Sequence, residues 1–445
     1  MALTPDTIVA PASGTGQAAI AVIRISGPKT RDLLEAFCGG VPAARHVALR
    51  AIGPKHAPLD RGLVLWFPGP ASFTGEDMAE LHVHGSRAVV QGAIDSLLAL
   101  EGTRLAEPGE FARRAFENGK LDLTEVEGLA DLIAAETEAQ RRQALAQAEG
   151  SLRRLYEDWR GELVRAQALV EAGLDFADEG DVAADVSAKA GAIVGPLLAS
   201  ISRHLADRSG ERLRDGVRIV IAGAPNAGKS SLMNALAKRD VAIVSEEAGT
   251  TRDVIEVHLD LAGLPVILTD TAGLREAEGK VEAEGIARAG ARLGEADLVV
   301  WVVDAEAPVQ EPPVVLAKGK PTVYALNKID LVTEATRSGL VPPPDCVPLS
   351  ARTGEGLDRL IELLGAAAAK QTAAGPGSPL LTRARHRVEL AGARAALQRF
   401  VNHDLGPELK AEELRIAARH LSRLTGRIDV EEVLGAIFSE FCIGK

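Results

Sequence analysis

The stretch Gly223-Ala-Pro-Asn-Ala-Gly-Lys-Ser230 lies where the sequence changes from a strand pattern to a helix pattern. An apolar run at 217–222 precedes it, and residues 231–236 follow with a helical pattern. The stretch matches G-x-x-x-x-G-K-[ST], a loop whose backbone N–H groups face a polyphosphate while the lysine reaches the β/γ oxygens and the hydroxyl binds Mg²⁺. A glycine-rich turn before a helix is the simpler alternative. We predict a nucleotide site with contacts from Gly223, Asn226, Ala227, Gly228, Lys229, Ser230 and Ser231.

Strands and helices alternate in the sequence after this loop. Strands are expected at 217–222, 254–261, 266–269, 298–304, 322–326 and 347–349, and helices at 230–238, 281–293 and 357–369. This alternation is typical of a mostly parallel, doubly wound sheet that binds its ligand at the carboxyl ends of the strands. We therefore expect a Ras-like P-loop domain.

Further short motifs follow at the ends of the expected strands. They are Gly249-Thr-Thr-Arg252, Asp270-Thr-Ala-Gly273, Asn327-Lys-Ile-Asp330 and Ser350-Ala-Arg352. The Asp330 carboxylate can accept from the N1–H and the exocyclic amine of guanine, whereas adenine offers no matching pair of donors. The order of these motifs predicts GTP and GDP binding with Mg²⁺. The predicted contacts are Thr250, Thr251, Asp270, Thr271, Ala272, Gly273, Asn327, Lys328, Asp330, Ser350, Ala351 and Arg352.

Helical sequences flank the strand-rich region on both sides. Residues 121–214 are rich in Ala, Leu, Glu, Gln and Arg, and one helical face carries Leu152, Leu155, Trp159, Leu163, Ala166 and Val170. The same composition returns at 381–400, 409–424 and 430–441, after the Gly/Pro-rich segment 375–379. We interpret 216–372 as a GTP-binding domain inserted into an all-helical domain, whose parts are 119–215 and 373–445.

The first 118 residues have a mixed pattern. Runs at 18–25 and 62–67 predict strands, and 88–100 predicts a helix, so an α+β domain is expected at 1–118. His82 and His84 are two apart on an expected strand and face one side, where they could pair on a metal. A polar strand face is the alternative, because no third ligand stands at a metal-site spacing.

Composition restricts the general class. A formal charge of −12 means that any contact with nucleic acid must come from a local patch. Cys38, Cys346 and Cys442 are far apart and form no C-x-x-C pair, which suits a reducing cytosol. The sequence also lacks a basic segment followed by an apolar run at its start. We expect a soluble cytoplasmic protein.

Several motifs outside the phosphate loop carry a resemblance to one family. They are Phe73-Thr-Gly-Glu-Asp77, Pro108-Gly-Glu-Phe111, Asn118-Gly-Lys-Leu-Asp-Leu123, Gly249-Thr-Thr-Arg-Asp253 and the terminal Phe441-Cys-Ile-Gly-Lys445. Together they resemble the bacterial tRNA-modification GTPase family MnmE, also called TrmE, over essentially the whole chain. The resemblance implies a homodimer formed through a folate-binding-like N-terminal domain that holds a 5-formyl-tetrahydrofolate-type carrier. It also implies an FAD-containing partner, MnmG or GidA, with which carbon 5 of the tRNA wobble uridine receives an aminomethyl or carboxymethylaminomethyl group.

The resemblance also implies roles for individual residues. In the GTP-binding domain, a K⁺ ion would be held by Asn226, Ser245, Glu247 and Thr250, Mg²⁺ by Ser230 and Thr251, and Glu282 would position water indirectly. In the N-terminal domain, Arg24, Glu80 and Lys120 would contact the folate. The sequence His82-Val-His84-Gly-Ser86 is less glycine-rich than expected of relatives, which affects the shape of the folate pocket.

The C-terminal tail suggests a second chemical role. We expect it to fold back to the folate pocket, where Cys442 would take part in the modification and Lys445 would contact the folate. A frayed terminus is the alternative.

Hydrolysis needs a group that orients water, yet Leu274 follows Gly273 where many small GTPases carry Gln. Three function classes stay open: a tRNA-modifying GTPase, an RNA-binding GTPase of ribosome assembly, and a folate-dependent one-carbon enzyme regulated by GTP. The folate-like region and the Cys-containing tail favour the first over the second. The inserted GTP-binding domain implies nucleotide-driven motion and favours the first over the third.

Overall fold

The computed structural model describes residues 6–14, 16–175, 180–239, 241–243, 256–270, 294–307, 320–333, 346–373, 381–403, 405–428, 431–439, 441 and 444. The chain forms two compact units. The first comprises Met1–Ala130, Ala148–Arg160 and Arg419–Lys445, and the second comprises Asp131–Gln147 and Gly161–Ala418.

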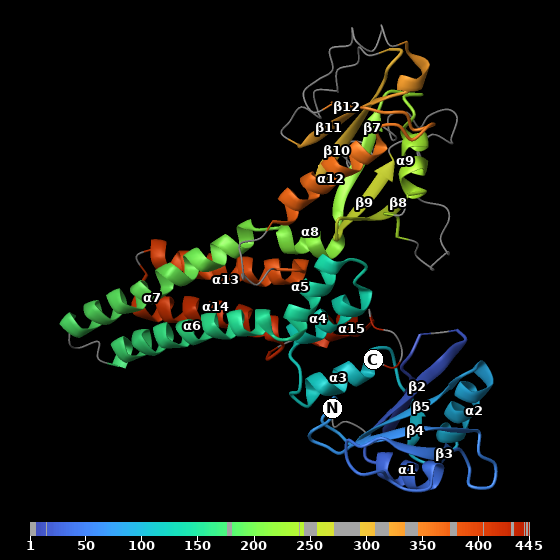
Figure 1. The fold of residues 1–445 in the computed structure, drawn as a ribbon. Helices are drawn as coiled ribbons and strands as arrows, with labels where there is room; N and C mark the ends of the chain where they lie inside the picture. The colour runs from blue at the N-terminus through green and yellow to red at the C-terminus, as the bar shows by residue number, and fades with distance from the viewer. Residues whose placement is uncertain are drawn as a thin grey trace, which may run out of the picture. The chain divides into compact units, whose positions relative to one another are not determined.

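The first unit is built on a mixed sheet. Its strands are β1 (Thr7–Pro11), β2 (Ala18–Ser26), β3 (Ala48–Ile52), β4 (Asp60–Phe67), β5 (Met78–Gly85) and β6 (Thr103–Leu105), in the order β3-β4-β5-β2-β1-β6. All neighbouring strands are antiparallel except β1 and β6, which run parallel. Helices α1 (Thr30–Cys38) and α2 (Arg87–Leu98) pack on one face of this sheet (Figure 1).

Alternation along β2 determines which side chains meet these helices. Ile23 and Ile25 point into the core with Leu34 of α1 and Leu97 of α2, because successive strand residues face opposite sides. Arg24 therefore lies on the other face of the sheet. Glu80, its cross-strand partner on β5, lies on that same face.

Further helices, one of them near the end of the chain, contribute to the first unit. Helix α3 (Glu110–Glu117) packs near α15 (Glu431–Ser439), and α4 (Leu123–Ala134) joins the same apolar cluster. Phe441 is buried in that cluster and lies against Phe438, with ring centroids 6.3 Å apart. The tail therefore begins from a fixed position in the core.

The second unit contains the alternating sheet that the sequence predicts. The strands are β7 (Val217–Gly223), β8 (Glu256–Leu261), β9 (Leu264–Asp270), β10 (Leu298–Asp304), β11 (Thr322–Asn327) and β12 (Cys346–Pro348). Their order is β12-β11-β10-β7-β9-β8, and only β8 is antiparallel to its neighbour. Helices α9 (Lys229–Ala237) and α12 (Leu357–Thr372) share one apolar cluster with the sheet. The expected helix at 281–293 lies outside the described residues.

Further helices make up much of the remaining described chain. They are α5 (Glu138–Ala148), α6 (Ser151–Asp175), α7 (Gly180–Ala206), α8 (Ser209–Asp215), α13 (Ala384–Asn402) and α14 (Pro407–Thr425). The stripe predicted on α6 is buried at Leu152, Trp159, Leu163, Ala166 and Val170. Leu155 is the exception: it is half-buried, and the adjacent Tyr156 is buried in the core instead. No helix in the described ranges is both long and apolar enough to cross a membrane.

Candidate functional sites

Parallel strands bring the nucleotide motifs to one edge of the second sheet. Strands β7, β9, β10 and β11 are parallel and end at Gly223, Asp270, Asp304 and Asn327. Carboxyl ends of parallel strands share one edge, which is where open α/β sheets bind ligands. The phosphate loop, the Asp270 motif and the Asn327-Lys-Ile-Asp330 motif therefore meet there.

The phosphate loop depends on backbone conformations that favour glycine. Gly228 has φ +93°, and a Cβ at this position would lie 2.2 Å from Nδ2 of Asn327. That amide in turn donates to the Ala227 carbonyl oxygen at 2.9 Å. Asn226 also has a left-handed φ of 63°, which asparagine tolerates better than most residues. The close approach of Gly228 to Asn327 thus fixes the loop directly before α9, whose N-terminus favours anions.

Lys229 and Ser230 have partners that suit a phosphate and a metal. Lys229 Nζ donates to the carbonyl oxygens of Gly223 at 3.1 Å and Ala224 at 2.8 Å, so its ammonium lies over the loop. Ser230 Oγ donates to Asp270 Oδ2 at 2.7 Å. Hydroxyl and carboxylate oxygens are the hard ligands that Mg²⁺ prefers. The two side chains fit a shared Mg²⁺ position.

The base-recognition motif is held by its own hydrogen bonds. Asn327 is buried and accepts from the backbone N–H of Ala351 at 3.0 Å, which joins it to Ser350-Ala-Arg352. Lys328 Nζ pairs with Asp304 Oδ2 at 2.6 Å. Hydrogen bonds from Ser350 and Arg352 hold the pKa of Asp330 below its usual value. Asp330 is therefore a carboxylate at neutral pH, as guanine recognition requires.

Several predicted nucleotide and metal residues lie outside the described ranges. They are Ser245, Glu247, Thr250, Thr251, Thr271, Ala272, Gly273 and Glu282. Of the expected K⁺ ligands, only Asn226 is described.

A second candidate site lies on the face of the first sheet opposite α1 and α2. Arg24 on β2 and Glu80 on β5 are direct cross-strand partners. Arg24 Nη2 lies 3.0 Å from Glu80 Oε1, and each side chain is about one-fifth exposed. The predicted folate residues Arg24 and Glu80 are thus in contact, and the guanidinium retains access to solvent.

Two aromatic rings and the tail surround the Arg24 guanidinium. Its Cζ lies 5.7 Å from the ring centroids of both Phe73 and Phe111, within the range of a cation–π contact. Its Nη1 donates to the carbonyl oxygen of Gly444 at 3.4 Å. The tail therefore returns to Arg24, although Cys442 and Lys445 themselves lie outside the described residues.

Lys120 and the two histidines have separate partners. Lys120 Nζ donates to the carbonyl oxygen of Pro70 at 2.9 Å, on the loop that carries Phe73. His84 Nδ1 lies 2.8 Å from Asp60 Oδ1, and His82 Nε2 lies 3.5 Å from Glu80 Oε2. No group of three His, Cys, Asp or Glu side chains in the described part is placed to hold a metal ion.

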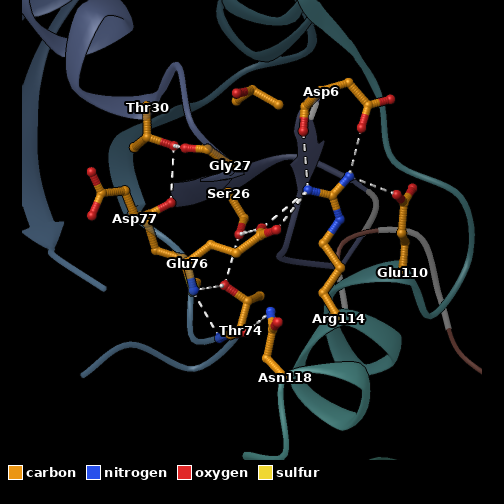
Figure 2. A network of polar contacts seen from close by, with 12 residues as sticks. Asp6, Ser26, Gly27, Thr30, Thr74, Glu76, Asp77, Glu110, Arg114 and Asn118 are labelled. Carbon is orange, nitrogen blue, oxygen red and sulfur yellow. Dashed lines mark hydrogen bonds and ion pairs between the residues drawn. The ribbon is translucent and has the colours of Figure 1, made fainter. Parts of the chain in front are cut away.

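Sequence reasoning gave no role to the residues that support Arg24. Phe73, Phe111 and Gly444 were present in the quoted motifs, but only the fold brings them to one guanidinium. A buried polar cluster around Arg114 was also missed (Figure 2). Its one sequence signal is the i,i+4 spacing of Glu110 and Arg114 on a helix.

Family comparisons cover both units. The model described as "GTP-binding protein TrmE N-terminus" matches residues 7–120, and "MnmE helical domain" matches residues 123–442. The second match spans the second sheet as well as the helices that precede and follow it in the sequence.

Curated relatives match along the full length. A "tRNA modification GTPase MnmE" of Beijerinckia indica is 52% identical over 100% of this chain and 97% of its own length. The protein of that name from Rhizobium johnstonii is 52% identical over 100% of both chains. Among solved structures, the G domain of the T. maritima FeoB iron transporter matches 35% of this chain and 99% of its own, with 28% identity and a TM-score of 0.24.

Proposed function

Because this chain belongs to the MnmE family of tRNA modification GTPases, we propose that it couples K⁺-dependent GTP hydrolysis to modification of the tRNA wobble uridine. The one-carbon unit comes from a 5-formyl-tetrahydrofolate-type carrier, and an FAD-containing partner, MnmG (GidA), takes part. The product carries an aminomethyl or carboxymethylaminomethyl group at carbon 5 of the wobble uridine. The reaction takes place in the cytoplasm. The observation that carries the GTPase assignment is the meeting of the phosphate loop, Asp270 and the Asn327–Asp330 motif at one sheet edge.

For GTP hydrolysis, we assign the metal contacts to this edge. Ser230 and Thr251 hold Mg²⁺ with help from Asp270, and Asn226, Ser245, Glu247 and Thr250 hold K⁺. A monovalent cation near the β/γ bridge supplies positive charge to the transition state, where other GTPases use an arginine. Glu282 positions the attacking water indirectly. The 2.7 Å contact of Ser230 with Asp270 supports the Mg²⁺ position.

For the folate, we assign Arg24, Glu80, Lys120 and Lys445 as contacts. Arg24 is about one-fifth exposed and stands between two aromatic rings, which suits a flat heterocycle or its carboxylate tail. Cys442 acts in the uridine chemistry. The return of Gly444 to Arg24 supports a tail that works at this pocket.

We also propose that two copies pair through the 1–118 domain, with 216–372 as the GTP-binding insert between helical segments 119–215 and 373–445. In the first sheet, Leu49 on the edge strand β3 is 56% exposed and lies opposite Leu63, which is 38% exposed. A partly apolar open face at a sheet edge supports a self-association surface.

The experiment that tests the folate assignment is a titration of the purified chain with 5-formyl-tetrahydrofolate. Wild type should bind one ligand per chain, and Arg24→Ala should lose most of the affinity. Arg61→Ala is the matched control, because Arg61 is an exposed arginine on strand β4 of the same sheet. Equal folate affinity in wild type and Arg24→Ala would show that Arg24 does not contact the folate.

A further inference from the structure

The guanidinium of Arg114 is buried among three carboxylates in the first unit. Its side chain is 8% exposed. Nη2 lies 3.1 Å from Asp6 Oδ1 and 3.0 Å from Glu110 Oε1, and Nη1 lies 3.0 Å from Glu76 Oε2 (Figure 2). Nη1 also donates to the backbone carbonyl oxygen of Asp6 at 3.1 Å. One arginine thus joins the start of β1, helix α3 and the loop before β5.

The charges in this cluster stabilise one another. Burial works to lower the pKa of Arg114, but Glu76 and Glu110 outweigh it and raise that pKa. Burial works to raise the pKa of Glu110, yet Arg104 and Arg114 keep it below its usual value. The pKa of Asp6 is lowered by the same two arginines against the effect of burial. Arg114, Glu110 and Asp6 are therefore ionised at neutral pH, and removing one partner leaves a buried charge without compensation.

Through Glu76, the cluster fixes the loop that leads into β5. The Glu76 carboxylate also accepts from Ser26 Oγ at 2.8 Å, and Ser26 Oγ lies 2.7 Å from Thr74 Oγ1. Asn118, at the end of α3, donates to the Thr74 carbonyl oxygen at 2.7 Å (Figure 2). The loop is therefore held from β2 on one side and from α3 on the other.

This loop and helix α3 carry the surroundings of Arg24. Phe73 precedes Thr74 on the loop, and its ring lies under the Arg24 guanidinium. Phe111 lies on α3 three residues before Arg114 and supplies the other ring. The same loop offers its Pro70 carbonyl oxygen to Lys120.

We propose that Arg114 is a positioning residue for the folate site: by binding Glu76, Glu110 and Asp6 together, it sets where Phe73 and Phe111 hold Arg24. Arg114 itself does not touch the ligand. This inference rests on the folate site proposed above, since the ligand whose affinity it governs is the folate.

An arginine is needed because of its donor geometry. A guanidinium presents five N–H donors in a rigid fork, whereas a lysine ammonium is a compact charge on a flexible stem. Arg114→Lys keeps the positive charge but cannot reach the three carboxylates and the Asp6 carbonyl oxygen at the same time. The variant therefore separates charge from positioning.

The test compares Arg114→Lys with Arg113→Lys, a control on the same helix whose arginine is exposed and pairs only with Glu117 among the described ion pairs. Two readouts are taken on the full chain: 5-formyl-tetrahydrofolate titration, and amide hydrogen exchange of peptides covering 69–77. We expect Arg114→Lys to raise the Kd about tenfold, the effect of losing one charge-assisted hydrogen bond, with one site per chain retained. Exchange at 69–77 should be faster, and Arg113→Lys should match wild type in both.

The binding stoichiometry distinguishes positioning from simple unfolding. A merely structural failure lowers the number of sites, whereas lost positioning raises the Kd at unchanged stoichiometry. Should Arg114→Lys not fold, Glu76→Gln removes the loop's charged partner while Arg114 keeps Asp6 and Glu110. Like Arg114→Lys, Glu76→Gln should weaken folate binding and speed amide hydrogen exchange at 69–77.

The outcomes separate this inference from the folate proposal. If Arg24→Ala loses binding while Arg114→Lys and Glu76→Gln bind like wild type, the positioning role is wrong and the folate site stands. If wild type binds no folate, the folate proposal fails. Amide hydrogen exchange at 69–77 is then the only test of whether Arg114 holds the loop. Faster exchange at 69–77 then supports its hold on the loop, and unchanged exchange overturns it.

Discussion

Asp330 is the residue on which base selectivity depends in this account. Its carboxylate accepts from Arg352 Nη2 at 2.6 Å, and its lowered pKa keeps it an acceptor throughout the neutral range. Asp330→Asn places an amide donor opposite the guanine amine, whereas xanthine offers a carbonyl there. We expect preference to move from guanine to xanthine nucleotides by at least about tenfold, the effect of one mispaired hydrogen-bond donor.

A competition assay with GDP and xanthosine diphosphate measures this change. Glu362→Gln, which neutralises an exposed carboxylate on α12, is the control. Undiminished selectivity for guanine nucleotides in Asp330→Asn would show that another group recognises the base.

Gly444 holds the tail at the first sheet through its backbone. Its φ is +98°, and a Cβ would lie 2.0 Å from the Pro11 carbonyl oxygen. A left-handed conformation alone costs another residue about 1–2 kcal/mol. We predict that Gly444→Ala displaces the tail from Arg24 and reduces wobble-uridine modification at least about tenfold.

Gly435→Ala is the matched control, because a Cβ at that helical glycine meets nothing within 4 Å. Modification is measured with purified chain, the FAD-containing partner and tRNA. Equal modification by Gly444→Ala and Gly435→Ala would mean that the docked tail has no part in the reaction.

At the scale of elements, the phosphate loop carries Asn226, through which we expect GTP hydrolysis to depend on K⁺. Asn226 has a left-handed φ of 63°, so Asn226→Ala would disturb both the side chain and the backbone. Asn226→Gly removes the side chain while tolerating that φ. We predict that wild type hydrolyses GTP about 10³-fold faster in K⁺ than in Na⁺, the lower end of what an arginine finger supplies, and that Asn226→Gly loses the preference.

Steady-state hydrolysis in the two salts at equal ionic strength measures this, and GDP affinity serves as the control for an intact loop. Equal wild-type rates in K⁺ and Na⁺ would contradict the K⁺ assignment.

Elements were far easier to predict from the sequence than contacts between them. The apolar runs and the alternation with helices located the parallel strands β7 and β9 to β12 within about two residues, since buried parallel strands have nearly continuous apolar sequences. The antiparallel strand β8, whose apolar residues alternate with polar ones, was located equally well. The pairing of Arg24 with Glu80 depends on the register between β2 and β5, which no local pattern specifies. The Arg114 cluster likewise joins Asp6, Glu76 and Glu110 from separate segments, so only the folded chain reveals it.

Tertiary packing also determines which of two adjacent apolar residues on α6, Leu155 or Tyr156, is buried. Helical spacing placed Leu155 on the buried stripe of α6, yet Tyr156 occupies the core, with its ring centroid 5.7 Å from that of Trp159. A large aromatic ring buries more apolar area than leucine, so the helix rotation that suits the ring is favoured.

At the scale of the whole molecule, the nucleotide site and the proposed folate site belong to different units. The described GTP motifs lie in the second unit, and Arg24 with the tail residue Gly444 lies in the first. Cys442→Ser should therefore abolish wobble-uridine modification while leaving K⁺-stimulated GTP hydrolysis within about twofold of wild type, because hydrolysis needs no group from the tail.

Cys38→Ser is the comparison for this variant. Cys38 is buried, and burial raises the pKa of its thiol to about 12, so it is unreactive at neutral pH. Fully modified tRNA from Cys442→Ser would show that the tail thiol is incidental.

The most direct test of the central claim is mass spectrometry of wobble nucleosides in tRNA from a strain that lacks this gene. We predict that aminomethyl or carboxymethylaminomethyl groups at carbon 5 of the wobble uridine are missing from that strain. The wild-type gene should restore them, and Ser230→Ala, which removes the Mg²⁺-binding hydroxyl, should not. Normal wobble-uridine modification in the strain without the gene would contradict the account.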